Sequence, residues 1–358
     1  MAEITVAAGR CWQYSHYVGR QGGAGTGFTA PIGVAVGKDD MLYVASRNNP
    51  RITKTTLDQE FIAEFGRGTP ENPNAPFPSR HMWITGIALD KDENVYTTDE
   101  WHNSVVICDK DGQVLKNWGE KGEEEGKLNG PSGLVFDADD NVWIVNSINS
   151  RIQKFTKDGQ YLGGFGQKGS AEGELDMPWG IAIDEEGDLY VADWNNHRVQ
   201  KFSVGGTHLR TFGSGKKTGI SPDGGTPYSH SYQSHIAVNP NDLNHPTGVA
   251  VDGDGDVYVM DWMNERVVIF GPDGGAVATL RGDASGLNKW AELSIAANPD
   301  MEKARRRVKT PEIQNYFRMP VACTFDRPNN RLLVCDTLRS RIQVYTKDAK
   351  YSDPQFNL

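Results

Sequence analysis

Residues 175–213 read LDMPWGIAIDEEGDLYVADWNNHRVQKFSVGGTHLRTFG and predict four short strands. The expected strands at 181–183, 189–192, 198–202 and 208–212 are separated by turns and corners rich in Asp, Asn and Gly. Short runs with this punctuation are typical of antiparallel sheet. A single sheet of this kind cannot bury its faces alone, so it needs further sheets to pack against.

Six copies of this unit appear when the chain is aligned on the aromatic residue that begins YVADWNNHRV. The copies start, in chain order, at Tyr43, Tyr96, Trp143, Tyr190, Tyr258 and Leu333. A glycine lies in the segment that leads into the first strand of five copies, and Ala322 takes its place in the sixth. A unit of about forty residues with four strands is typical of a propeller blade. The sequence therefore predicts an all-β fold, a six-bladed β-propeller.

The N-terminal segment predicts how the ring closes. Residues Trp12 to Val18 read as a fourth strand with no first three strands of its own. The sixth copy, from Val321 to Tyr345, has no evident fourth strand. We therefore predict that the N-terminal strand completes the last blade, because an open sheet edge would favour aggregation. One propeller domain then accounts for residues 1–358.

Charge and composition narrow the classes of partner. The formal net charge of −10 argues against a duplex nucleic-acid partner, because such proteins bind largely by neutralising phosphates. The basic run 305–307 lies among acidic residues, so we expect an ion-paired helix face there. No apolar run is long enough for a membrane helix, and Met1–Arg10 does not resemble a signal peptide. We expect a cytoplasmic protein with a small-molecule ligand or substrate, no nucleic-acid or membrane partner and no nucleotide cofactor, in an oligomeric state left open.

Three connections between copies carry insertions, at residues 67–84, 214–243 and 283–317. We expect them all on one face of the ring, together with the corners between the second and third strands; we call this the decorated face. Residues 298–299 and 310–311 each place a capping side chain before a proline, which predicts helices in the third insertion. Long loops in compact domains are often lids or binding loops. The second and third insertions are therefore expected to roof a site at the channel mouth.

Repetition separates scaffold from candidate site. An aspartate recurs in the corner of four copies, at Asp99, Asp193, Asp261 and Asp336. An arginine recurs five residues after this corner position in five copies. Recurrence in blade after blade is most simply explained by scaffold, as a side-chain turn in the corner with ion pairs. Residues that occur once on the decorated face are the candidates for function.

The candidate catalytic residues are Arg47, His81, Glu100 and His102. We expect the histidines or the glutamate to move protons and the arginine to hold substrate charge. The candidate substrate-binding residues are Trp83, Trp179, Trp194, Trp262, Tyr228 and Tyr232. A divalent metal, zinc or calcium, is the candidate cofactor, with His81, His102 and His245 as its ligands. The alternatives are that the tryptophans pack beneath the insertions and that the histidines are ordinary loop residues.

The segment 177–202, MPWGIAIDEEGDLYVADWNNHRVQKF, resembles an NHL repeat, and all six copies fit the pattern. The resemblance implies a six-bladed NHL propeller over nearly the whole chain, whereas function varies within such a fold. Similar propellers include the peptidylglycine alpha-amidating lyase, which holds zinc through histidines set between Pro and Gly of the lead-in. None of those positions is a histidine in this sequence, where they hold Ile32, Thr85, Ser132, Trp179, Thr247 and Val321.

Gluconolactonase-like propellers are also similar and use acids and an asparagine for a divalent ion. The resemblance would place Asp99, Glu100 and Asn146 in that role. Taken together, these patterns predict a small-molecule enzyme of lyase or hydrolase type, with its site at the decorated mouth and a divalent metal as candidate cofactor. The alternative is a non-catalytic propeller that binds a ligand or a protein.

Overall fold

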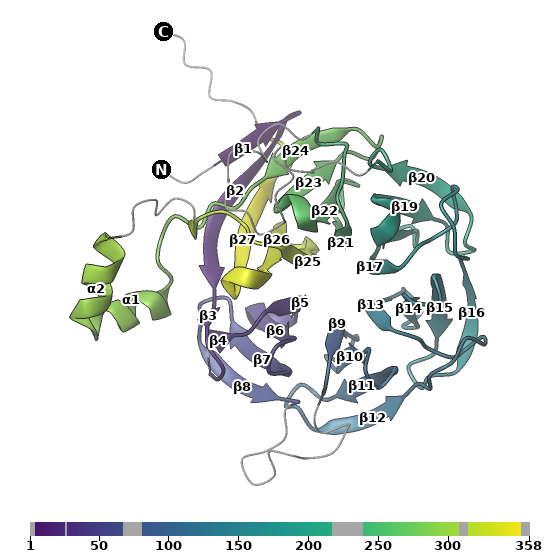
Figure 1. Ribbon diagram of the computed structural model, residues 1–358, viewed down its shortest axis with the longest axis horizontal. Coiled ribbons are helices and arrows are strands. Elements are labelled where there is room, and N and C mark those ends of the chain that lie inside the picture. Colours follow the sequence, from purple (N-terminus) through teal and green to yellow (C-terminus); the bar gives the residue numbers. More distant parts are fainter. Residues whose placement is uncertain (1–3, 26, 67–80, 217–238, 308–313, 352–358) are drawn as a thin grey trace.

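Six antiparallel sheets form a closed ring around a central channel (Figure 1). The structure is a computed structural model and describes residues 4–25, 27–66, 81–216, 239–307 and 314–351. Each of the first five blades is one sheet whose four strands follow one another from the channel outwards, and the sixth is a five-stranded sheet. The predicted fold, an all-β propeller of six blades, is confirmed.

The strands of the first three blades are β5 (Pro31–Val36), β6 (Met41–Ser46), β7 (Arg51–Thr56) and β8 (Phe61–Phe65); β9 (Ile84–Leu89), β10 (Val95–Asp99), β11 (Ser104–Cys108) and β12 (Val114–Trp118); and β13 (Pro131–Phe136), β14 (Val142–Asn146), β15 (Arg151–Phe155) and β16 (Tyr161–Phe165). Those of blades four and five are β17 (Pro178–Ile183), β18 (Leu189–Asp193), β19 (Arg198–Phe202) and β20 (His208–Phe212); and β21 (Pro246–Val251), β22 (Val257–Asp261), β23 (Arg266–Phe270) and β24 (Ala276–Leu280). Blade six contains β25 (Pro320–Asp326), β26 (Arg331–Asp336), β27 (Arg341–Asp348), β2 (Arg10–Val18) and β1 (Ile4–Ala7), and β3 (Arg20–Gln21) pairs with β4 (Gly27–Phe28) beside it.

The hydrophobic core consists of six layers, one between each pair of neighbouring blades. Between blades four and five, for example, Tyr190 and Phe212 pack with Val257 and Phe270. The residue on which the six copies align is at most 4% exposed in every blade. The repeated pattern is therefore a repeated packing surface, and each blade buries its faces only against its two neighbours.

The lead-in glycines are required where neighbouring blades meet at the channel. A Cβ on Gly180 would lie 2.3 Å from the carbonyl oxygen of Thr247 in blade five. A Cβ on Gly86 would lie 2.5 Å from the carbonyl oxygen of Ser132 in blade three. These neighbours are backbone atoms of the next innermost strand, so a side chain at either glycine would push two blades apart. The same contact explains why the glycine recurs in the sequence.

The strand β2 is the outer partner of β27 and joins the two ends of the chain in one sheet. Pairing runs from Cys11 opposite Asp348 to Val18 opposite Ile342. Trp12 is 1% exposed, packs in the layer between blades five and six, and donates its Nε1–H to the Tyr258 hydroxyl at 3.0 Å. The N-terminal segment thus contributes both backbone pairing and core side chains to the closed ring.

A cluster of charged side chains, which we call the seam cluster, joins blade five to the two strands at the closure. Lys347 on β27 is buried, and its Nζ lies 2.5 Å from Asp252, 2.8 Å from Asp254 and 2.9 Å from Asp256. Arg10 on β2 reaches Asp256 at 2.7 Å. The three aspartates of one turn therefore pair with one cation from β27 and one from β2. Without these partners, charged groups would be buried unpaired, which is costly.

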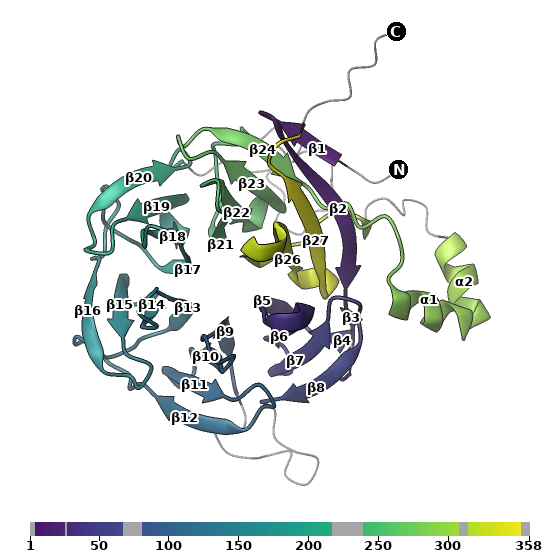
Figure 2. The same ribbon diagram turned by 180° about the vertical axis from the view of Figure 1, so that it is seen from behind.

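The two described α-helices lie outside the ring rather than over its channel. Helices α1 (Lys289–Ala296) and α2 (Pro299–Arg306) project beyond the perimeter in both views (Figures 1 and 2). Asn288 donates its Nδ2–H to the carbonyl of Gly19, and Trp290 donates Nε1–H to the carbonyl of Gln59, each at 2.5 Å. These contacts fix α1 to the outer wall, so the expectation that the third insertion roofs the mouth is corrected. No helix in the described ranges is long and apolar enough to cross a membrane.

Candidate functional site

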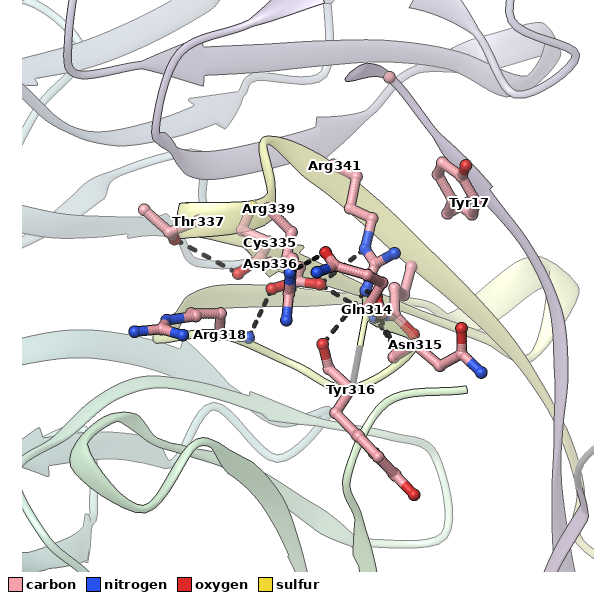
Figure 3. A network of polar contacts seen from close by, with 12 residues as sticks. Tyr17, Gln314, Asn315, Tyr316, Arg318, Cys335, Asp336, Thr337, Arg339 and Arg341 are labelled. Carbon is pink, nitrogen blue, oxygen red and sulfur yellow. Dashed lines mark hydrogen bonds and ion pairs between the residues drawn. The ribbon is translucent and has the colours of Figure 1, made fainter. Parts of the chain in front are cut away.

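The corner of blade six shows the repeated scaffold in full (Figure 3). Arg341 donates Nε–H to Asp336 at 2.7 Å. Its Nη2 donates to the backbone carbonyls of residues 314–316. The other oxygen of Asp336 accepts the backbone N–H of Arg318 at 2.7 Å. Burial raises the pKa of Asp336, and the paired arginine opposes this rise. The pair ties the corner to the chain that leads into the blade.

Blades four and five repeat this arrangement with an added asparagine. Asp193 accepts from Arg198 at 2.8 Å and from Asn196 at 2.9 Å. Asp261 accepts from Arg266 at 2.6 Å and, likewise, from an asparagine amide, that of Asn264, at 2.8 Å. The corner aspartates of these blades are therefore neutralised by an arginine, as the repetition of both residues predicts.

Blade two departs from the pattern at both partner positions. Its corner aspartate, Asp99, has no exposed surface, yet Ser104 stands where the other blades place arginine. His102 stands where blades four and five place asparagine, and its Nδ1 lies 3.2 Å from Asp99 Oδ1. The same oxygen accepts the backbone N–H groups of Trp101 and His102, both at 3.1 Å. In this blade, a buried carboxylate holds an imidazole instead of a guanidinium.

His81 lies behind this pair and is 1% exposed. Its Nε2 lies 3.4 Å from the Thr97 hydroxyl, and its buried Nδ1 has no hydrogen-bond partner among the described residues. Burial lowers the pKa of His81 to about 4, and the Asp99 carboxylate opposes this change. His81 is therefore a neutral imidazole at physiological pH.

An exposed aromatic and charged rim borders the same corner. Trp83 and Trp101 are 44% and 58% exposed and meet edge to face, with ring centres 5.2 Å apart. Arg47 of blade one lies with its guanidinium carbon 5.5 Å from the Trp83 ring centre. One guanidinium nitrogen of Arg47 is 2.5 Å from a carboxylate oxygen of Glu100. The structure thus brings together Arg47, His81, Trp83, Glu100 and His102 from the predicted set.

A second group of predicted residues lies on blades four and five, across the ring (Figure 1). The Trp194 ring centre is 4.3 Å from that of His245 and 6.2 Å from that of Trp262. His245 also donates its backbone N–H to His197 Nδ1 at 3.1 Å. This aromatic group is separate from the blade-two corner, so the two halves of the predicted site do not form one site.

His245 lies apart from the other two predicted metal ligands. His81 and His102 lie on blade two, whereas His245 lies at the lead-in of blade five on the opposite side of the ring. The predicted three-histidine site is therefore not formed. In the described ranges, no group of three or more His, Cys, Asp or Glu side chains is arranged to hold a metal ion. These donors do not fit the three protein ligands of a catalytic zinc or the six or more oxygens of a calcium site.

The central channel is a cavity of about 1060 Å³ lined by the innermost strands. Of the predicted site residues, Trp179 lines it. The lining continues to Lys38, Lys91 and Arg327 at the face opposite the decorated one. The predicted residues Tyr228 and Tyr232 lie outside the described ranges.

Asp99 is a functional candidate that the repeat pattern assigns to the scaffold. It recurs as a corner aspartate, so the pattern assigns it to the scaffold together with Asp193, Asp261 and Asp336. The signal that distinguishes it lies five residues later, where Ser104 replaces the arginine of the other blades. Asp99 occupies the same corner position as the other three aspartates but lacks the arginine that pairs with them. Its electrostatic role therefore differs from theirs.

We expect acidification to destabilise the protein through His81. The unfolded histidine binds a proton near pH 6.5 and the folded one near pH 4, so the unfolded state holds more protons between these values. Stability is present in full above pH 6.5 and is lost as pH falls through this window, by up to about 1.4 kcal/mol per pH unit. Urea unfolding at several pH values should show a shallower pH dependence for His81→Gln. Equal slopes for variant and wild type would contradict this assignment.

Comparison with known proteins identifies NHL repeats in three of the six blades. A family model described as NHL repeat matches residues 128–155, 175–202 and 243–270, which lie in blades three, four and five. No curated protein matches the sequence.

The structure is similar to solved propellers at low sequence identity. A protein of unknown function from Bacteroides thetaiotaomicron has a TM-score of 0.64 and 16% identity, covering 95% of this chain and 76% of that one. A gluconolactonase from Xanthomonas campestris has a TM-score of 0.55 and 14% identity, covering 95% and 90%. Virginiamycin B lyase from Staphylococcus aureus has a TM-score of 0.52 and 13% identity, covering 94% and 99%. At these identities the likeness concerns the fold, which enzymes and proteins of unknown function share.

Proposed function

We propose that this six-bladed β-propeller, in which three segments match the NHL repeat, is an enzyme that transforms a small molecule at the decorated corner of blade two. The observation that carries the proposal is the exchange of both partners of a buried corner aspartate. A scaffold pair of arginine and asparagine is replaced by Ser104 and His102. Blade two therefore lacks the buried aspartate–arginine pair of the other blades. It carries instead the imidazole of His102 beside Asp99.

His102 is the proposed general base. Its Nδ1–H donates to Asp99, so the lone pair of the neutral ring resides on Nε2. A buried carboxylate behind an imidazole holds it in one tautomer and orientation and stabilises the imidazolium that forms when it takes a proton. His102 therefore has the arrangement of a base positioned by an acid, which commonly contributes about 10²–10⁴-fold to a rate.

Arg47 is the proposed anchor for an anionic group of the substrate. Glu100 holds one guanidinium nitrogen and Trp83 lies beside the guanidinium plane, so the side chain is held in place. A guanidinium fixed in this way binds carboxylate or phosphate through its remaining N–H groups. The exposed faces of Trp83 and Trp101 add a surface on which an apolar or planar part of the same molecule can stack.

These roles define the reaction class. A base beside an anion anchor removes a proton from a carbon acid next to a carboxylate, as in a lyase, or from a water, as in a hydrolase. In both cases the proton passes to Nε2 of His102, and the Asp99 carboxylate balances the imidazolium. Lyase or hydrolase chemistry on an anionic small molecule is therefore the proposed activity.

The test restores the scaffold in blade two. We expect His102→Asn with Ser104→Arg to rebuild the corner of blades four and five, and so to fold at least as stably as the natural chain. Turnover of a panel of small carboxylates, phosphate esters and lactones, followed by mass spectrometry, should fall by about 10²-fold or more. The matched control is Asn196→His in blade four, which should leave turnover unchanged.

Two results would overturn the proposal. The first is equal turnover by the natural chain and the restored variant. The second is a panel compound that stabilises the natural chain against heat, loses this effect in Arg47→Ala, and yields no product. That outcome would make the propeller a non-catalytic binding protein.

A further inference from the structure

A basic helical arm projects from an otherwise acidic ring. We call residues 289–307 the arm; α1 and α2 pack against each other within it and extend beyond the perimeter (Figures 1 and 2). It contains five Lys or Arg and three Asp or Glu residues. Five minus three gives a net charge of +2, within a chain whose net charge is −10. The remaining residues therefore sum to −12.

The arm also exposes apolar side chains. Leu293 on α1 is 54% exposed and Met301 on α2 is 47% exposed. Arg306 and Arg307 are exposed at the end of α2. The start of α1 is fixed to the ring through Asn288 and Trp290. A surface with apolar centres and a cationic end, held away from its own ring, suits an acidic partner surface.

The chain itself carries such a surface on the connection between blades two and three. Glu123, Glu124 and Glu125 are consecutive and exposed, and the charges of Glu124 and Glu125 act on nearby Arg151. The connection joins β12 to β13, on a sector of the ring away from the arm (Figure 1). Because the two surfaces lie in different sectors of the ring, a contact between them requires a second copy.

We propose that the protein forms a two-fold dimer in which the arm of each copy docks on residues 123–125 of the other. Two-fold symmetry satisfies both contacts at once, because each copy supplies one arm and one acidic connection. Leu293 and Met301 lose water in the contact, while the arginines and glutamates set its orientation. This inference concerns assembly and is independent of the chemistry proposed for blade two.

Sedimentation velocity on the full chain tests the dimer by charge exchange. We expect the natural chain to sediment as a dimer and to dissociate in about 1 M salt, where the screening length falls to about 3 Å. Arg306→Glu with Arg307→Glu should give monomers, as should Glu123→Lys with Glu124→Lys and Glu125→Lys. An equal mixture of these two variants should form a dimer again, because each arm then faces a connection of opposite charge. Lys110→Glu with Lys168→Glu, at exposed positions outside both surfaces, should remain dimeric.

The proposal fails if the natural chain is a monomer at every concentration. It fails also if the charge-reversed variants stay dimeric or if their mixture stays monomeric. Binding of the monomeric chain to anionic lipid vesicles, lost in the Arg306 and Arg307 variant, would assign the arm to a membrane surface and overturn the dimer. Leu293→Asp provides a second route to monomers that leaves the charges of the arginines intact.

Discussion

A chain that lacks residues 1–19 is expected not to unfold cooperatively, because the ring cannot close without β2. The deletion removes Trp12 from the layer between blades five and six and Val18 from the layer between blades six and one. Loss of a buried tryptophan side chain alone costs about 3–5 kcal/mol. Whole domains are stable by only about 5–15 kcal/mol. The deletion also removes all the backbone pairing between β2 and β27. We therefore expect the total loss to exceed the free energy of unfolding of the domain.

Circular dichroism during heating and size-exclusion chromatography measure this effect. The matched control is deletion of residues 1–8, which removes β1 and leaves Arg10 and all of β2 in place. This shorter deletion should keep a sharp transition and a monodisperse peak. A soluble chain without residues 1–19 that melts at the natural temperature would show that β2 does not close the ring.

Lys347→Met is expected to destabilise the folded protein by about 3–5 kcal/mol, the cost of removing one partner from a buried charge group. The lysine is 4% exposed and lies within 3 Å of three carboxylates. Methionine has a similar length but leaves Asp252 and Asp256, both almost fully buried, with only Arg10 as counter-ion. The midpoint of urea unfolding should fall clearly at unchanged slope.

The comparison variant is Lys350→Met, three residues further along the chain at an exposed position. A surface change of this kind should alter stability by less than about 0.5 kcal/mol. Similar unfolding midpoints for the two variants would mean that the seam cluster contributes nothing specific to the closure.

The fold could be predicted from the sequence because its elements are repeated. Six alignable copies specify six blades, and the lead-in glycine reports a close approach between backbones that the structure shows at Gly86 and Gly180. The path of the third insertion could not be predicted in the same way. Cap residues indicate where its helices begin, whereas their place on the outer wall depends on the hydrogen bonds of Asn288 to Gly19, just after β2, and of Trp290 to Gln59 in blade one.

The site could be predicted only in part, for a geometric reason. The position of a residue within its repeat determines how far along the ring axis it lies, that is, its height. The repeat to which it belongs determines the blade in which it lies, that is, its sector of the ring. His81, His102 and His245 share a height, which is why they look like one ligand set. They differ in sector, because blades two and five stand opposite each other. The missing arginine at Ser104 was visible in the sequence, but its meaning depends on the burial of Asp99.

The pairing of β2 with β27 also determines how the ring responds to a mechanical load. The start of β2 and the end of β27 lie side by side, with Cys11 opposite Asp348. A force that separates the chain ends therefore acts on one backbone pair at a time, from Cys11 and Asp348 towards Val18 and Ile342. Sequential loading opens a sheet at a far lower force than sliding its strands along each other, because the bonds do not share the load. We therefore expect pulling on the two strand ends to open the closure at a low force.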